Sequence, residues 1–150
     1  TDANGSIVRR IDITGTYLDR TGQGFGTLET TIENIWSGTF TDSAGITYEL
    51  ATDISRLGTG LSAQLAGPSM TFRIGDCPGN YACASSVTGV ITVENPRAFF
   101  GDRTGVGHEF GHVLGFHHFN NGAGNIMSYD DVGSVTIENV LLLWNQYGAQ

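Results

Sequence analysis

One stretch of eleven residues, HEFGHVLGFHH at positions 108–118, holds all four histidines of this 150-residue chain and restricts its fold most strongly. His108 and His112 are four positions apart, so on a helix both imidazoles lie on one face, one turn apart. At that spacing two ring nitrogens can bind one metal ion at about 2.0–2.1 Å. The stretch predicts a helix that presents two metal ligands.

The residues around this pair complete a predicted metal site. Glu109 projects about a hundred degrees away from His108, too far round the helix to bind the same metal but able to contact a water on it. Gly115 can adopt a positive φ, which lets the helix end and the chain turn sharply. After that turn His118 can reach the metal. His117 is one residue out of register, and we expect it to lie at the surface or behind the ligands.

Composition indicates one folded domain over residues 1–150. Hydrophobic residues make up 39 % of the chain, enough for a core, and no run approaches the ~18 apolar residues of a membrane helix. The formal charge is −8 and all seven basic residues are arginines, a poor surface for nucleic acid or anionic lipid. We therefore expect a soluble monomer that binds neither nucleic acid nor membrane. The start of the sequence does not resemble a signal peptide, so any signal or pro-segment is expected upstream of Thr1.

The hydrophobic pattern predicts an α+β fold. Its expected centre is a twisted, mostly parallel mixed sheet of about five strands with an antiparallel edge strand. A backing helix, a helix carrying the histidines and a C-terminal helix are expected to accompany it. The predicted strands are 6–13, 46–54, 70–75, 82–87 and 90–94, and the predicted helices are 28–37, 104–116 and 137–147. The helix at 104–116 is expected to begin at a cap provided by Asp102 or Thr104.

The two cysteines, Cys77 and Cys83, lie close together in the segment DCPGNYAC. One interpretation is a disulfide that fixes the Pro-Gly-Asn turn and implies an oxidising compartment. The other is a pair of zinc thiolates, although no second pair of cysteines exists to complete such a site. Turns such as DRTGQG and DSAG could bind a structural Ca²⁺, but such turns are common without one, and we do not predict it.

HEFGHVLGFHH matches HExxHxxGxxH, the zinc-binding signature of the metzincin metalloendopeptidases. The segment NIMSY resembles their Met-turn, with Met127 nine residues past His118. The resemblance implies one catalytic Zn²⁺ bound by His108, His112 and His118, with Gly115 at the turn. It also implies that Met127 forms a hydrophobic floor beneath the metal.

Within the metzincins the chain combines features of different subfamilies. The order of its predicted elements and the short gap from the third histidine to the methionine resemble matrixins. Tyr129, the last residue of Met-x-Tyr, instead resembles the tyrosine of astacins and serralysins, which can ligate zinc or stabilise the oxyanion. Matrixins also bind a second, structural zinc through further histidines. Because only His117 remains here, we expect that second site to be absent.

The predicted function is that of a secreted or extracytoplasmic zinc endopeptidase acting on a protein or peptide. Glu109 would serve as general base toward a zinc-bound water, with Tyr129 assisting as a second catalytic residue. An extended substrate would add to the weak edge strand 82–87, which makes Ala84, Ser85 and Ser86 candidate substrate-binding residues. The pocket after the scissile bond would be walled by the histidine helix and by residues 129–135, with Asp130 and Asp131 at its rim.

Two other functions fit the same residues. The chain could be a toxin-type protease domain of a larger bacterial polypeptide, which only the sequence before Thr1 would reveal. It could also be a binding module that holds zinc without cleaving. Glu109 argues against the second alternative, because a non-catalytic site needs no base there.

The rim carboxylates lead to a prediction about cleavage preference. In a peptide-library digest we expect Arg, Lys or polar residues to be enriched directly after the cut, because Asp130 and Asp131 border a short pocket wall. Alternatively, both aspartates turn outward, for example to pair with Arg103, and leave an apolar pocket. Dominance of Leu, Phe or Met at that position, with no enrichment of Arg or Lys, would exclude the electrostatic hypothesis and leave the zinc mechanism intact.

Overall fold

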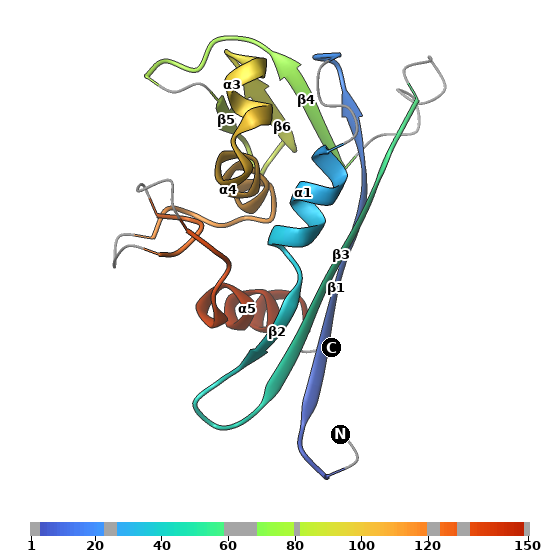
Figure 1. Cartoon of the computed structure of the whole chain (residues 1–150), viewed down its shortest axis with the longest axis vertical. Coiled ribbons are helices and arrows are strands. Elements are labelled where there is room, and N and C mark those ends of the chain that lie inside the picture. Colours follow the sequence, from blue (N-terminus) through green and yellow to red (C-terminus); the bar gives the residue numbers. More distant parts are fainter. Residues whose placement is uncertain are drawn as a thin grey trace.

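A computed structural model describes residues 4–22, 27–58, 69–79, 82–119, 124–128 and 133–148 (Figure 1). Their fold is mixed α/β, which confirms the predicted class. Within these ranges the strands are β1 Val8–Asp19, β2 Gly38–Thr41, β3 Thr47–Arg56, β4 Met70–Ile74, β5 Ala82–Ala84 and β6 Val90–Val93. The helices are α1 Leu28–Ile35, α3 Pro96–Gly101, α4 Arg103–Val113 and α5 Ile137–Leu143, with α5 continuing into the π-helical turn η1 Trp144–Gly148.

The described strands form one mixed sheet in the order β2-β3-β1-β4-β6-β5. The inner pairs β1–β3, β1–β4 and β4–β6 are parallel, whereas β2 and β5 pair antiparallel at the two edges. The sheet therefore has six strands and two antiparallel edges, where about five strands and one such edge were expected.

The unexpected strand is β2, which directly follows α1. Phe40 continues the helical spacing of the preceding apolar residues, so the pattern alone does not reveal a strand. Gly38 has φ of +154°, a conformation that ends the helical path, and Phe40 then pairs with Tyr48 of β3. Long-range pairing with β3 overrides the local periodicity.

Helix α3 was also not predicted, although its start carries a recognisable signal. Asn95 precedes the helix, and its side chain accepts a hydrogen bond from the backbone N–H of Ala98 at 3.2 Å. Pro96 occupies the first helical position, where its missing N–H costs nothing. In α4 the cap is Asp102 rather than Thr104, because the Asp102 carboxylate accepts from the N–H of Gly105 at 3.1 Å.

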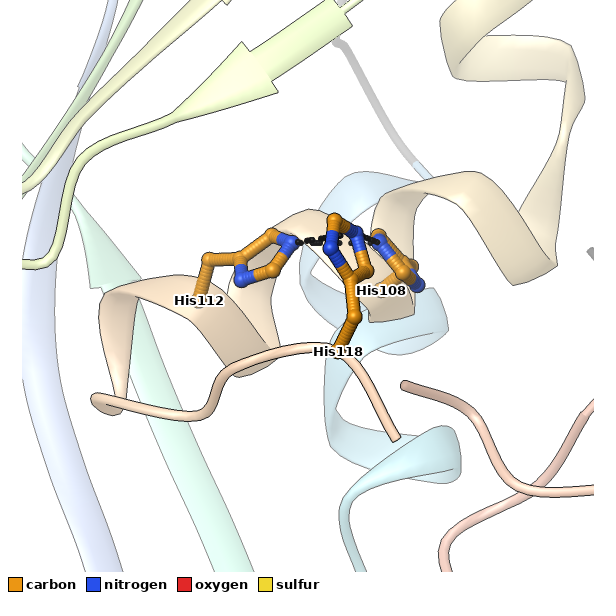
Figure 2. A group of neighbouring side chains, drawn as sticks. All are labelled: His108, His112 and His118. Atoms are coloured by element: carbon orange, nitrogen blue, oxygen red, sulfur yellow. Dashed lines mark hydrogen bonds between the residues drawn. The ribbon is translucent and has the colours of Figure 1, made fainter. Parts of the chain in front are cut away.

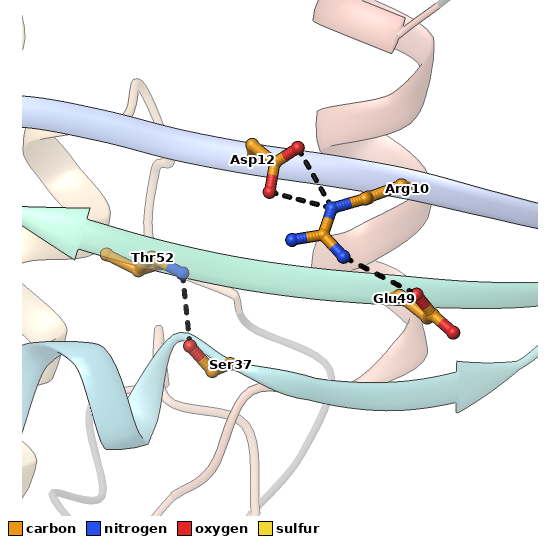
Figure 3. A network of polar contacts seen from close by, with 5 residues as sticks. All are labelled: Arg10, Asp12, Ser37, Glu49 and Thr52. Atoms are coloured by element: carbon orange, nitrogen blue, oxygen red, sulfur yellow. Dashed lines mark hydrogen bonds and ion pairs between the residues drawn. The ribbon is translucent and has the colours of Figure 1, made fainter.

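Helix α1 is fixed along the edge of β3 where β2 no longer covers it. Three polar side chains, spaced four apart, accept hydrogen bonds from alternate N–H groups of β3. Four residues of helix rise about 6 Å and two residues of strand about 6.6 Å, so the two spacings nearly match. The pairs are Ser37 with Thr52 at 3.1 Å (Figure 3), Glu33 with Ile54 at 3.0 Å, and Glu29 with Arg56 at 3.1 Å.

The helices lie on one side of the long strands β1 and β3 (Figure 1), and this face of the sheet forms the core. Along β3 buried residues alternate with exposed ones, as expected for a strand covered on one face only. On the open face, Arg10 contacts Asp12 at 3.0 Å and Glu49 at 3.8 Å (Figure 3). These side chains are well exposed, so water and dissolved salt screen the pairs and they contribute little to stability.

Cys77 and Cys83 form a disulfide, which confirms the first of the two interpretations. Cys83 lies in the edge strand β5, and Cys77 lies just beyond the end of β4 and is buried. The bond ties the edge strand to the body of the sheet. Among the described helices, none has both the length and the apolar character needed to cross a bilayer.

Candidate metal centre

Three histidine side chains converge on one point from α4 and from the segment that follows it (Figure 2). The Nε2 atoms of His108 and His112 are 3.1 Å apart. The Nε2 atom of His118 lies 3.1 Å from that of His108 and 3.2 Å from that of His112. This arrangement brings together the three residues that the sequence singled out as ligands, and it could hold a metal ion.

The protonation of the rings shows why a cation suits this site. Nδ1 of His108 lies 2.7 Å from the carbonyl oxygen of Ile126, and Nδ1 of His112 lies 2.8 Å from that of Phe116. Because a carbonyl only accepts, both Nδ1 atoms carry the proton, and in the neutral rings both Nε2 atoms present lone pairs. Two lone pairs 3.1 Å apart repel each other. A metal ion between them turns that repulsion into two bonds, and histidine ligands usually donate their other N–H in this way.

The spacing also fits the size of a transition-metal ion. Three nitrogens at 2.0–2.1 Å from a tetrahedral metal lie about 3.3–3.4 Å apart. The observed triangle of 3.1–3.2 Å is slightly tighter, so His108, His112 and His118 could together hold an ion of this size. Three imidazoles suit zinc, copper, iron or nickel.

The electrostatic surroundings keep the ligands in the neutral form that metals require. Burial lowers the pKa of His112 most strongly, and the neighbouring His118 and His117 lower it further against the opposing effect of the Phe116 carbonyl. Burial also lowers the pKa of His118, with added contributions from His108 and His117. At neutral pH a metal ion could therefore bind without first displacing protons from these two rings.

The end of α4 is a Schellman turn around Gly115, whose φ is +103°. The N–H of Phe116 donates to the carbonyl of Gly111, and the N–H of Gly115 to that of His112, both at 3.0 Å. Only a glycine adopts this conformation readily, so the predicted role of Gly115 in the turn agrees with the structure. The turn also supplies the Phe116 carbonyl that orients His112, while the chain proceeds to His118.

A buried floor supports the ligand helix from below. Met127 is fully buried, and a Cβ built on Gly111 would collide with its Sδ and would lie 2.9 Å from Cζ2 of Trp36. A Cβ on Gly107 would lie 2.8 Å from Cγ2 of Ile35. Sequence reasoning did not identify Gly107 and Gly111, although small residues four apart are a signal of close packing on one helix face. Their missing side chains let α4 approach both the end of α1 and Met127.

Trp36 joins this floor to the ligand helix. Its Nε1–H donates to the carbonyl of Gly107 at 2.9 Å, inside the core. Its ring stacks on Phe116 with centroids 5.5 Å apart. Trp36 therefore contacts both the middle of α4 and the turn at its end, and both parts carry a histidine ligand.

Glu109 follows the first ligand directly and is half-buried. One of its carboxylate oxygens, Oε2, is shielded from solvent. His117 is exposed and does not belong to the converging group, as its register predicted.

The predicted substrate-binding residues lie partly within the described ranges. Ala84 ends the edge strand β5, and helix α4 packs beside this strand. Ser85 and Ser86 lie in the turn to β6, where the N–H of Ser85 donates to Val90 and its carbonyl accepts from Gly89. The other two, Asp130 and Asp131, lie outside the described residues, and so does Tyr129, the predicted second catalytic residue.

Comparisons with known proteins supply no assignment for this arrangement. A scan against protein-family models finds no match, and a search of curated proteins finds none.

The geometry predicts different metal affinities for two neighbouring variants. His118→Ala removes one of three ligands. It should therefore weaken Zn²⁺ binding by more than the about 10–100-fold that is typical of losing a residue hydrogen-bonded to a ligand. His117→Ala serves as the control and should bind Zn²⁺ as the wild type does. Competition with a chromophoric chelator measures both affinities. Loss of binding in His117→Ala, with binding retained in His118→Ala, would show that the ligand assignment is wrong.

A second prediction concerns pH and the metal-free protein. Since the pKa values of His112 and His118 are lowered on folding, the unfolded chain takes up protons that the folded chain resists. This stabilising contribution is complete above about pH 6.5 and is lost as pH falls through the lowered pKa values. Urea unfolding of chelator-treated protein at about pH 7.5 and about pH 5.5 measures the loss. The double variant His112→Gln/His118→Gln should lose less stability over this interval, and an equal loss would contradict the prediction.

Proposed function

We propose that this chain is a zinc-dependent endopeptidase of the metzincin type. The observation that carries the proposal is the convergence of three Nε2 atoms within 3.2 Å, with a glutamate directly after the first ligand. A closed structural site would require a fourth protein ligand, and the described residues offer no His, Cys, Asp or Glu that joins the three. An open position on the metal is what hydrolysis requires.

The chemistry divides between the ion and one side chain. His108, His112 and His118 would hold the Zn²⁺, which when bound would supply a position for a water and lower the pKa of that water towards 7. Glu109 is placed one residue after His108, where its carboxylate can accept a proton from the attacking water and later donate it to the leaving amine. Oε2 is shielded from solvent, which supports this role because a base in a site that excludes bulk water does not lose its proton to the solvent.

The edge strand β5 supports a peptide as substrate. The N–H of Ser85 donates to the carbonyl of Val90 across the turn. In an antiparallel pair such as β5–β6, residues whose backbone groups bond to the partner strand alternate with residues whose backbone groups point away from it. The backbone N–H and C=O of Cys83 therefore point toward β6, and those of Ala82 and Ala84 point toward the open edge of the sheet. An extended peptide that pairs with these two alanines would run beside α4 and its histidines. Since Ser85 uses both of its backbone groups within the turn, its part in binding would be limited to its side chain.

The disulfide supports a site of action outside the reducing cytoplasm. Cysteines with this spacing persist as a bond in an oxidising compartment, and they are otherwise reduced. The bond between Cys77 and Cys83 secures the strand to which the substrate would bind. The oxidising conditions met on secretion would therefore also keep this strand in place for substrate binding.

The proposal is tested by replacing the predicted base. Glu109→Gln should keep the fold and bind Zn²⁺ but lose about 10²–10⁴-fold in turnover of an unstructured protein, because the amide preserves shape but cannot take the proton. Zinc content and cleavage are measured on the same preparations, before and after chelation. Turnover in the variant within about tenfold of wild type would exclude the mechanism. A wild-type protein that binds zinc and cleaves nothing would instead be a binding module.

A further inference from the structure

The tight turn that contains Met127 contacts the metal centre at two points. The carbonyl of Ile126 accepts the Nδ1 proton of His108 at 2.7 Å. The carbonyl of Met127 accepts the N–H of Phe119, the residue after His118, at 2.9 Å. The conformation of this turn therefore sets the direction of the His108 ring and the path of the chain beside His118.

Asn125 controls that conformation. Its Oδ1 accepts a hydrogen bond from the backbone N–H of Met127 at 2.8 Å. This N–H and the Ile126 carbonyl belong to one peptide unit, which is planar. When Asn125 fixes the direction of the N–H, it also fixes the direction of the carbonyl, and with it the orientation of His108.

The side chain of Asn125 is in turn fixed by the start of α5. Its Nδ2 donates to Oδ1 of Asn139 and to Oγ1 of Thr136, both at 2.9 Å. Oδ1 of Asn139 also accepts the backbone N–H of Thr136 at 2.9 Å. Asn139 is completely buried, and among the described residues its Nδ2 finds no acceptor. Its oxygen, rather than its nitrogen, makes the useful contacts.

We propose that Asn139 is a positioning residue for the metal centre, acting on His108 through Asn125 and the Ile126–Met127 peptide unit. The inference rests on the proposed metal site but not on proteolysis. Each hydrogen bond in this series polarises the next one, from Asn139 through Asn125 and the peptide unit to His108. The series therefore also increases the electron density at the metal-binding nitrogen of His108. Loss of the Asn139 oxygen leaves Asn125 with Thr136 as its remaining acceptor and frees its amide to rotate.

Zinc affinity of two variants tests the proposal, with competition against a chelator as the measurement. Asn139→Leu keeps the number and branching of the side-chain heavy atoms and favours the helix but removes the oxygen. We expect its Zn²⁺ dissociation constant to rise about tenfold, at the lower end of the range for outer partners of a ligand. Asn139→Asp keeps the oxygen and should bind Zn²⁺ at least as tightly as the wild type.

The control is Val140→Ala, which is equally buried in the same helix but has no polar contact with the turn. It should lower the melting temperature and leave zinc affinity unchanged. An Asn139→Leu protein with wild-type affinity, or an equal loss of affinity in Val140→Ala, would overturn the proposal. Either result would leave the proposed endopeptidase activity standing, since that activity is judged by cleavage and by Glu109. A wild-type chain that binds no Zn²⁺ would overturn both.

A second measurement decides the question if Asn139→Leu does not fold. In metal-free Asn139→Asp, the proton on Nδ1 of His108 should change its NMR frequency, because a carboxylate polarises the hydrogen-bonded chain more than an amide does. A purely structural role for Asn139 would not move that signal. An unchanged frequency in the folded variant would overturn the proposal.

Discussion

The structure is organised around a repulsion that only a cation relieves. Two backbone carbonyls hold the protons of His108 and His112 on Nδ1, and this forces the lone pairs of both Nε2 atoms towards each other at 3.1 Å. The surrounding fold determines this arrangement, and a metal ion held by both nitrogens would remove the repulsion between their lone pairs. A locally unfavourable contact of this kind, in a chain whose other residues suit the fold, is typical of a functional site.

The elements that hold the His108 and His112 rings in this arrangement come from distant parts of the sequence. Helix α1 is held on the edge of β3 by three side chains and ends at Trp36, which donates to Gly107 in α4. Gly111 lets α4 rest against Met127, and the turn before Met127 orients His108 from the other side. The ligand helix is therefore fixed from two directions. Its own amphipathicity contributes little to this, because glycines and histidines make up most of its buried face.

Sequence reasoning succeeded where the relevant information is local. The register of three histidines and Gly115 lies within eleven residues, and helical geometry translates that spacing directly into positions in space. The pairing of Cys77 with Cys83 was predictable for the same reason. Strand β2 could not be foreseen from its own residues, because Phe40 becomes a strand residue only through its partner Tyr48.

The same distinction explains the missed residues of the site. Gly111 and Asn125 have roles that depend on Met127 and Asn139, which approach them only in the folded chain. An isolated Asn or Gly predicts a turn or a flexible position, and that is the correct local inference. What the local inference lacks is the identity of the atoms that will face the residue, and these are set by packing across the whole domain.

Metal binding and folding are related because the site depends on both local and long-range features of the chain. Ligand spacing is encoded locally, but the tautomers and directions of the rings depend on contacts between residues far apart in the chain. The unfolded chain contains the motif without the carbonyls that hold Nδ1, so it would bind a metal ion less tightly than the folded chain would. A ligand that prefers the folded state stabilises it in proportion to the logarithm of its concentration over its dissociation constant. Metal held by His108, His112 and His118 would thus stabilise the packing of α4 against Met127 and Trp36, and that packing would in turn strengthen metal binding.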